Sequence, residues 1–117
     1  MKIRLSARDV ALTERLRSHV RRRLALALGR FGERIDKVSV RFTRTDVGRE
    51  TSQKHCRIQL DLGPRPVSVE DADADPFAAA DGATDRLSRS VARALDRERD
   101  ESLRASPPLP VLAGSKP

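Results

Sequence analysis

The 117-residue sequence has no Trp, no Tyr and only one Cys. A lone Cys excludes an internal disulfide and is typical of a protein kept in a reducing cytoplasm. No apolar run approaches the roughly 20 residues that a membrane-spanning helix needs. The N-terminus alternates charged and apolar residues, which is not the pattern of a secretory signal. We therefore expect a cytoplasmic chain without membrane contact, and one domain whose lean core is built from aliphatic side chains.

Basic side chains are abundant and unevenly distributed. The net charge is +7, and the sequence pI is about 10.9. Residues 1–45 carry 13 basic and 4 acidic side chains, whereas residues 67–85 carry 6 acidic side chains and no basic one. Most of the basic residues are Arg, whose planar guanidinium suits bidentate contact with phosphate. This charge favours a polyanionic partner such as a nucleic acid, although a generally solvated Arg-rich surface would have the same composition.

The first half of the chain predicts a strand, a helix and a second strand. Residues 2–7 alternate polar and apolar side chains with the period of a half-buried strand, and residues 36–43 do so again. Thr13 is a suitable N-cap for a helix between them, and Gly29 and Gly32 are expected to end that helix. Its apolar positions recur at spacings of three and four and form one stripe: Leu16, Val20, Leu24, Ala27 and Phe31.

Two further strands are predicted after a polar loop over residues 44–53. Residues 56–62 alternate, with Cys56 and the following aliphatic residues on the inner side. A Gly-Pro pair at 63–64 signals a turn. A short fourth strand follows at 67–69, and Pro66 near its start marks it as an edge strand.

A long helix is predicted from an Asp-Pro start at residues 75–76 to about Asp100. Gly82 weakens its first turns by roughly 1 kcal/mol relative to Ala. Residues 104–117 are rich in Pro and lack apolar periodicity, so we expect a folded domain over 1–103 and a disordered tail over 104–117. The inner face of the helix is expected to hold Ala80, Thr84, Leu87, Val91 and Leu95.

The order of elements, β-α-β-β-β-α, predicts an α+β fold. A right-handed strand-helix-strand crossover makes the first two strands parallel, and short loops make the other pairings antiparallel. Both helices then cover one face of a four-stranded mixed sheet. This arrangement is similar to that of double-stranded-RNA-binding domains.

Charges are sorted along the second predicted helix. At 100° per residue, Arg86, Arg93 and Arg97 share a narrow arc with Arg89 beside it, while the opposite flank carries Asp81, Asp85 and Asp96. We interpret the basic flank as available to an external anion, with further Arg on the first helix; a solubilising face is the alternative. The candidate RNA-binding residues are Arg22, Arg23, Arg86, Arg89, Arg93 and Arg97.

Other candidate sites are weaker. The open face of the sheet carries Arg4, Arg41 and Arg57, but it lacks the exposed aromatic rings on which single-stranded bases stack. The acidic run over residues 70–75 has the ligands that a hard cation prefers, yet we interpret it as a loop that favours the following helix N-terminus. His19 and His55 lack partners at ligand spacing, and Cys56 is expected in the core. We predict no catalytic residues, no metal site and no cofactor.

The sequence resembles the ribosome hibernation-promoting factor family, which includes the ribosome-associated inhibitors, from residue 1 to about 100. The residues that carry the resemblance are 3–13 at the start, Leu16, Arg17, Val20, Arg23, Leu24, Arg30 and Phe31 in the first helix, and 75–81, 85–87 and Arg89 in the second. Arg23, Arg86 and Arg89 match basic positions of the family that face ribosomal RNA. Arg22, Arg93 and Arg97 extend the surface by helical geometry alone.

The resemblance implies a translation inhibitor that binds the small ribosomal subunit and its rRNA in the mRNA and tRNA channel. Such a protein stabilises inactive ribosomes during stress or stationary phase, is not an enzyme, and is monomeric away from the ribosome. The sequence ends without the C-terminal dimerisation domain of long family members, so we expect the short form. The loop over 44–53 and the acidic run also depart from short members. The alternative is a general structured-RNA-binding module or RNA chaperone that is not specific to ribosomes.

Overall fold

The computed structural model describes residues 1–45 and 52–105. The α+β element order predicted from the sequence is confirmed. The predicted tail lies outside the described residues from position 106 onward, as does the centre of the polar loop. The elements are β1 (Lys2–Arg8), α1 (Glu14–Leu28), the 3-10 helix η1 (Gly29–Arg34), β2 (Ile35–Thr45), β3 (Gln53–Leu62), β4 (Arg65–Asp73) and α2 (Pro76–Ala105).

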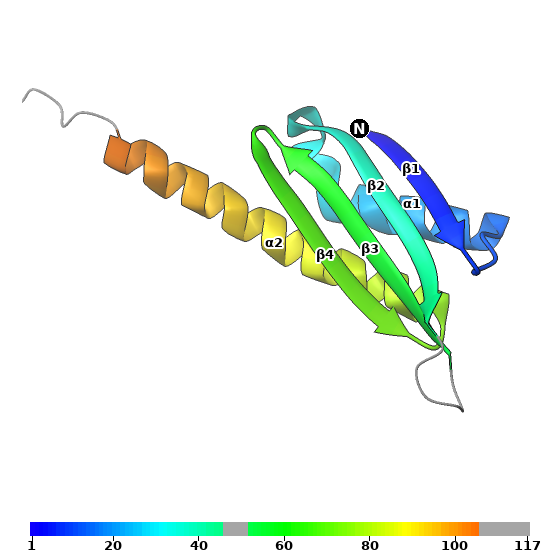
Figure 1. Ribbon diagram of the computed structural model, residues 1–117. Helices are drawn as coiled ribbons and strands as arrows, with labels where there is room; N and C mark the ends of the chain where they lie inside the picture. The colour runs from blue at the N-terminus through cyan, green and yellow to red at the C-terminus, as the bar shows by residue number, and fades with distance from the viewer. Residues whose placement is uncertain (46–51, 106–117) are drawn as a thin grey trace, which may run out of the picture.

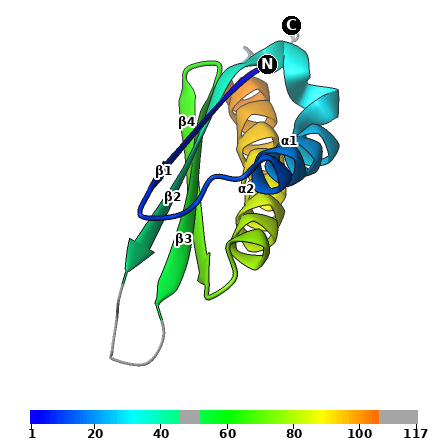
Figure 2. The ribbon, with the colours of Figure 1, turned by 90° about the vertical axis from the view of Figure 1, so that its right-hand side faces the viewer.

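The four strands form one mixed sheet in the order β1-β2-β3-β4. β1 runs parallel to β2, and the other two pairings are antiparallel. Both helices lie on the same side of the sheet, with α2 crossing behind β3 and β4 and α1 on the β1 side (Figures 1 and 2). In the part of the chain that the structure describes, no helix lies over the opposite side of the sheet.

The core lies between the sheet and the two helices. Alternate residues of β2 and β3 point into it, as their period predicted, and Cys56 is fully buried among them. The part under α2 is filled mainly by small residues, because α2 lies close to the sheet there. Its buried positions are Ala79, Ala80, Ala83, Thr84, Leu87, Val91 and Ala94.

The first helix begins after the predicted cap Thr13 and ends at the predicted Gly29, but the path of the chain after Gly29 differs from the prediction. The Thr13 side chain caps it by accepting a hydrogen bond from the Leu16 amide at 3.2 Å. Gly29 does not reverse the chain, because its φ of −54° is right-handed and the backbone continues into η1. As a result Leu28 completes the buried stripe, while Ala27 and Phe31 are only partly buried.

The prediction that the acidic run forms a loop was wrong. β4 continues to Asp73, and most of the run pairs with β3. Glu70 lies opposite Arg57 and Asp73 lies opposite Lys54, and Glu70 Oε2 lies 3.0 Å from His55 Nδ1 of β3, a cross-strand contact that favours the longer strand. Asp75 alone keeps the predicted role, since its Oδ1 accepts a hydrogen bond from the Phe77 amide at 2.9 Å.

The second helix is also longer than predicted, reaching Ala105 rather than about Asp100. Two ion pairs hold its C-terminal half. Glu98 accepts hydrogen bonds from Arg34 of η1 at 2.8 and 2.9 Å, and Glu101 pairs with Arg65 at the start of β4. These two ion pairs involve residues that follow the apolar stripe of α2. The end near Asp100 was predicted from that stripe alone.

Candidate nucleic-acid interface

The basic flank of α2 lies along β4, the edge strand of the sheet. The Asp75 cap starts the helix immediately after β4 ends, so α2 turns back along the same strand. Three arginines one turn apart, Arg86, Arg89 and Arg93, all have exposed side chains there. Together with residues of β4 they line an open groove of about 460 Å³, here called the α2–β4 groove: Ser68, Val69, Glu70, Arg86, Arg89, Ser90 and Arg93.

The groove continues toward the C-terminal half of α2. Ser68 and Ser90 also line the adjoining stretch, which has a volume of about 300 Å³ and includes Arg97 and Arg65. Within the described residues, no carboxylate lies within ion-pair distance of Arg86, Arg89, Arg93 or Arg97. The groove therefore presents four unpaired guanidinium groups in a row beside two serine hydroxyls.

Glu70 is the carboxylate nearest to this row among the groove's lining residues. Its Oε2 lies 3.0 Å from Nδ1 of His55 on the neighbouring strand, so it has a partner on β3. Arg65 is likewise engaged, with Glu101. The four α2 arginines thus keep their charge available to an anion.

The acidic flank of α2 packs against α1, which explains the sorting of charge along the helix. Asp81 Oδ1 lies 2.6 Å from His19 Nε2 and 3.2 Å from Arg23 Nε. Arg23 Nη2 donates a hydrogen bond of 3.0 Å to Asp85. The His19 ring also meets Phe77 edge-on, with ring centroids 5.2 Å apart. The carboxylates join the two helices and leave the arginines on the outer flank.

The six arginines predicted from the sequence do not form one site. Arg86, Arg89, Arg93 and Arg97 share the α2–β4 groove. Arg23 lines a different hollow between α1 and α2, and its side chain is only 33% exposed. Arg22, its neighbour on α1, is exposed and does not line the α2–β4 groove.

Sequence reasoning missed Ser68, Ser90 and Arg65 as parts of the groove. Ser90 follows Arg89 in the helix pattern, and its position beside the basic arc is visible from the 100° spacing. Ser68 and Arg65 belong to β4, and nothing local in the sequence indicates which helix flank this strand adjoins.

The remaining reactive side chains are placed unfavourably for chemistry. Burial raises the pKa of the Cys56 thiol from 9.0 to about 12, and the nearby carboxylates of Asp71 and Glu70 add to that shift.

In residues 1–45 and 52–105 no group of three or more His, Cys, Asp or Glu is arranged to hold a metal ion. None of the described helices is long and apolar enough to span a bilayer.

Comparisons with known proteins agree with this fold. Residues 3–99 match the model of the family described as Sigma 54 modulation protein / S30EA ribosomal protein. The ribosome hibernation promotion factor of Deinococcus radiodurans is 31% identical over 107 residues, which are 91% of this chain and 56% of that protein. The chain thus spans little more than half the length of this relative.

Two solved structures have the same architecture. The N-terminal domain of Protein Y from Thermus thermophilus is 32% identical, with a TM-score of 0.62 over 80% of this chain and 98% of that one. A ribosomal subunit interface protein from Coxiella burnetii has a TM-score of 0.69 over 82% of this chain and 99% of that one. The second is 14% identical and supports the fold alone.

Proposed function

This chain belongs to the Sigma 54 modulation protein / S30EA ribosomal protein family, and from that premise we propose that it is a ribosome-associated translation inhibitor. It binds the small ribosomal subunit in the channel for mRNA and tRNA and stabilises inactive ribosomes during stress or stationary phase. The name of a relative that is 31% identical, a ribosome hibernation promotion factor, supports this function.

The observation that carries the proposal is the row of four arginines along the α2–β4 groove, none of which has an ion-pair partner among the described residues. Guanidinium groups one helical turn apart follow a sugar–phosphate backbone, and Ser68 and Ser90 supply hydroxyls for sugar or phosphate oxygens. Such contacts recognise the shape and charge of folded RNA rather than a base sequence. This is the recognition that a protein filling an rRNA-lined channel needs.

Arg22 and Arg23 have different roles in this proposal. Arg22 is exposed on α1 and extends the cationic surface across the helical layer. Arg23 is a positioning residue, because its guanidinium joins α1 to Asp81 and Asp85 of α2. It fixes the angle between the two helices that present the RNA-binding side chains.

The protein acts by occupancy and not by catalysis in this proposal. Inhibition then requires no turnover and follows the fraction of subunits that carry a bound copy. It acts in the cytoplasm, where its ribosomal partner is found. A general RNA chaperone would instead bind isolated duplex RNA and small subunits with similar affinity, and the comparison of those two affinities discriminates the alternatives.

The test is co-sedimentation of the full chain with purified small subunits over a range of salt concentrations. If about five phosphates are contacted, the log of affinity falls against the log of salt with a slope of about −3 to −5. The double variant Arg89→Gln with Arg93→Gln is expected to lower the affinity, to weaken translation inhibition in parallel, and to make the slope shallower by about 2.

A matched control loses the same charge elsewhere. Arg21 lies on the side of α1 away from Arg23, since two residues apart corresponds to 200° of helical rotation. Arg99 lies on the α2 flank that also carries Asp81, and both side chains are exposed. Replacing Arg21 and Arg99 with Gln is expected to change the slope by less than about 0.5. Absence of ribosome binding by the unaltered chain, or equal losses in both double variants, contradicts the proposal.

A further inference from the structure

The helix-free face of the sheet carries a second concentration of basic side chains. Its outward positions on β1, β2 and β3 include Arg4, Arg41 and Arg57, all exposed. Within residues 1–45 and 52–105, no carboxylate lies within ion-pair distance of these three guanidinium groups. Because α1 and α2 lie on the other side of the sheet (Figure 2), these three arginines lie apart from the α2–β4 groove, and the two surfaces meet only at the edge strand β4, where Ser68 lines both.

Arg41 and Arg57 occupy directly opposite positions in the antiparallel pairing of β2 and β3. Like charges at facing positions repel each other and destabilise a sheet. Glu70 faces Arg57 from β4 and is the carboxylate placed to relieve this repulsion. Its Oε2 is instead bonded to His55 Nδ1 at 3.0 Å. The sheet therefore maintains a pair of facing cations that an external anion would stabilise.

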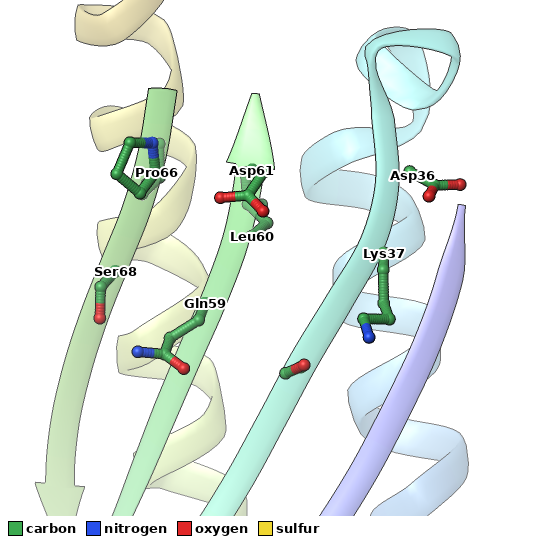
Figure 3. Close-up of a pocket in the computed structure, with 9 residues that line it drawn as sticks. Asp36, Lys37, Gln59, Leu60, Asp61, Pro66 and Ser68 are labelled. Atoms are coloured by element: carbon green, nitrogen blue, oxygen red, sulfur yellow. The ribbon is translucent and has the colours of Figure 1, made fainter. Parts of the chain in front are cut away.

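The same face is hollowed at one end. A depression of about 380 Å³ crosses β2, β3 and β4, and Figure 3 shows Lys37, Gln59 and Ser68 around it on the side away from the helices. With Ser39, these side chains offer an amide, two hydroxyls and an ammonium group. Asp36 and Asp61 also line this end, so phosphates are favoured nearer to Arg41 and Arg57. The hollow instead suits a neutral hydrogen-bonding group such as a ribose.

We propose that this open sheet face is a second RNA-binding surface, which takes the sugar–phosphate backbone of an RNA segment distinct from the one in the α2–β4 groove. Phosphates meet Arg4, Arg41 and Arg57, and a ribose enters the hollow beside Ser39 and Gln59. The protein then lies between two RNA segments and keeps them apart by the thickness of one domain. The inference rests on the proposed function, because it assigns a second contact in the same ribosomal complex.

The composition of the face favours RNA over an acidic protein surface. Hydroxyl and amide groups that both donate and accept are interspersed with the arginines, at Ser6, Ser39, Gln59 and Ser68. These groups match the 2′-hydroxyl, which is also both donor and acceptor. Among the residues described, none with a large apolar side chain is exposed at the centre of the face, whereas protein interfaces bury an apolar core.

The test places a cleaving probe on each surface of the full chain. Ser6→Cys, beside Arg41 on the open face, and Ala92→Cys, exposed on α2 one helical turn from the groove residue Arg89, are each labelled with an iron chelate that generates hydroxyl radicals. The native Cys56 is buried and does not compete for the label. In complexes with purified small subunits, the two probes are expected to cut rRNA at two separate sets of positions.

A second measurement uses charge. Arg41→Gln with Arg57→Gln is expected to leave the thermal midpoint unchanged or higher, because repulsion is relieved. It is expected to make the salt slope of subunit binding shallower by about 2, and to add to the effect of the Arg89 and Arg93 substitutions. The Arg21 and Arg99 double variant remains the control.

The outcomes separate the two proposals. If the unaltered chain does not bind small subunits, the proposed function fails. If it binds, and the Ala92 probe cuts rRNA while the Ser6 probe does not, the second surface fails and the first stands. A loss of affinity in the Arg41 and Arg57 variant without cleavage from Ser6 indicates a ribosomal protein on this face and overturns the RNA assignment.

Discussion

The carboxylate of Asp71 in β4 lies against the backbone of Gly82 in α2, in the space that a Cβ at position 82 would occupy. Such a Cβ would be 2.7 Å from Asp71 Cγ, which is closer than real Cβ contacts allow. Glycine inside a helix costs about 1 kcal/mol relative to Ala. The close approach of β4 to α2 explains why glycine is present here.

Replacing Gly82 with Ala is therefore expected to stabilise the protein only where Asp71 is absent. In an Asp71→Ala background, Gly82→Ala should raise the free energy of unfolding by about 1 kcal/mol through helix propensity. In the native background the gain should vanish or become a loss, because the Asp71 side chain must move. Urea unfolding of the four proteins gives the coupling. Equal gains in both backgrounds would show that the carboxylate moves without cost.

Gly29 provides the control for that cycle. Its φ of −54° suits any residue, and nothing lies within 4 Å of a Cβ built there. Gly29→Ala is expected to be neutral or stabilising by up to about 1 kcal/mol, irrespective of residue 71.

Cys56 is expected to react slowly in the folded protein. Thiolate is the reactive form, and a pKa raised from 9.0 to about 12 reduces the thiolate fraction at pH 8 by a factor of about 1000. Full burial of the side chain slows the reaction further. Alkylation by iodoacetamide should become rapid only in denaturant. Fast alkylation of the native protein at pH 8 would contradict this burial.

The same pKa shift predicts loss of stability in alkaline solution. Because the folded state holds the thiol proton more tightly, this contribution is complete below pH 9 and is lost as pH rises from 9 toward 12. Between pH 8 and pH 10, the free energy of unfolding should fall by about 1 kcal/mol more in the native protein than in a Cys56→Ala variant. All other titrating groups are common to the two proteins, so parallel profiles of unfolding free energy against pH would contradict this prediction.

Much of the fold could be predicted because its signals are local. The Thr13 and Asp75 caps, the alternation in β2 and β3, and the Gly63 turn, with φ of 62°, each depend on neighbouring residues. The 3-10 helix that continues the chain after α1, and the length of β4, could not be predicted in this way. Both depend on contacts between distant segments, namely the packing of Leu28 in the core and the pairing of Glu70 and Asp73 with β3.

The candidate site, like the fold, could be predicted only where its signal is local. Helical spacing alone identifies the arc of Arg86, Arg93 and Arg97. It cannot identify which strand adjoins that arc, nor that Asp81 and Asp85 bind Arg23 across the helix pair. Those facts depend on the relative placement of α1, α2 and β4.

The C-terminal half of α2 is expected to be held by its ion pairs with little effect on global stability. Replacing Glu98 with Gln removes the bonds to Arg34, both partly exposed, and should lower the free energy of unfolding by no more than about 1 kcal/mol. Amides in the last turns of the helix should exchange with solvent several-fold faster, while those near Leu87 should not change. Uniform loss of protection would indicate that the pair stabilises the whole domain.

The neighbouring residues Arg22 and Arg23 offer the sharpest test of how charge is used on α1. Both are Arg on one helix, and changing either to Gln removes the same charge with nearly the same helix propensity. Arg22 is exposed, so Arg22→Gln should leave the thermal midpoint unchanged and reduce subunit affinity modestly, with a salt slope shallower by at most about 1.

Arg23→Gln instead leaves Asp81 and Asp85 without their α1 guanidinium, and it should lower the free energy of unfolding by about 1 kcal/mol. Its effect on affinity should be partly recovered in the variant Arg23→Lys, which keeps a cation between the two carboxylates. Thermal melts and subunit co-sedimentation on the three variants check both properties together. If Arg23→Gln were as stable as the native protein and bound subunits far more weakly than Arg22→Gln, Arg23 would be a direct RNA contact and not a link between the helices.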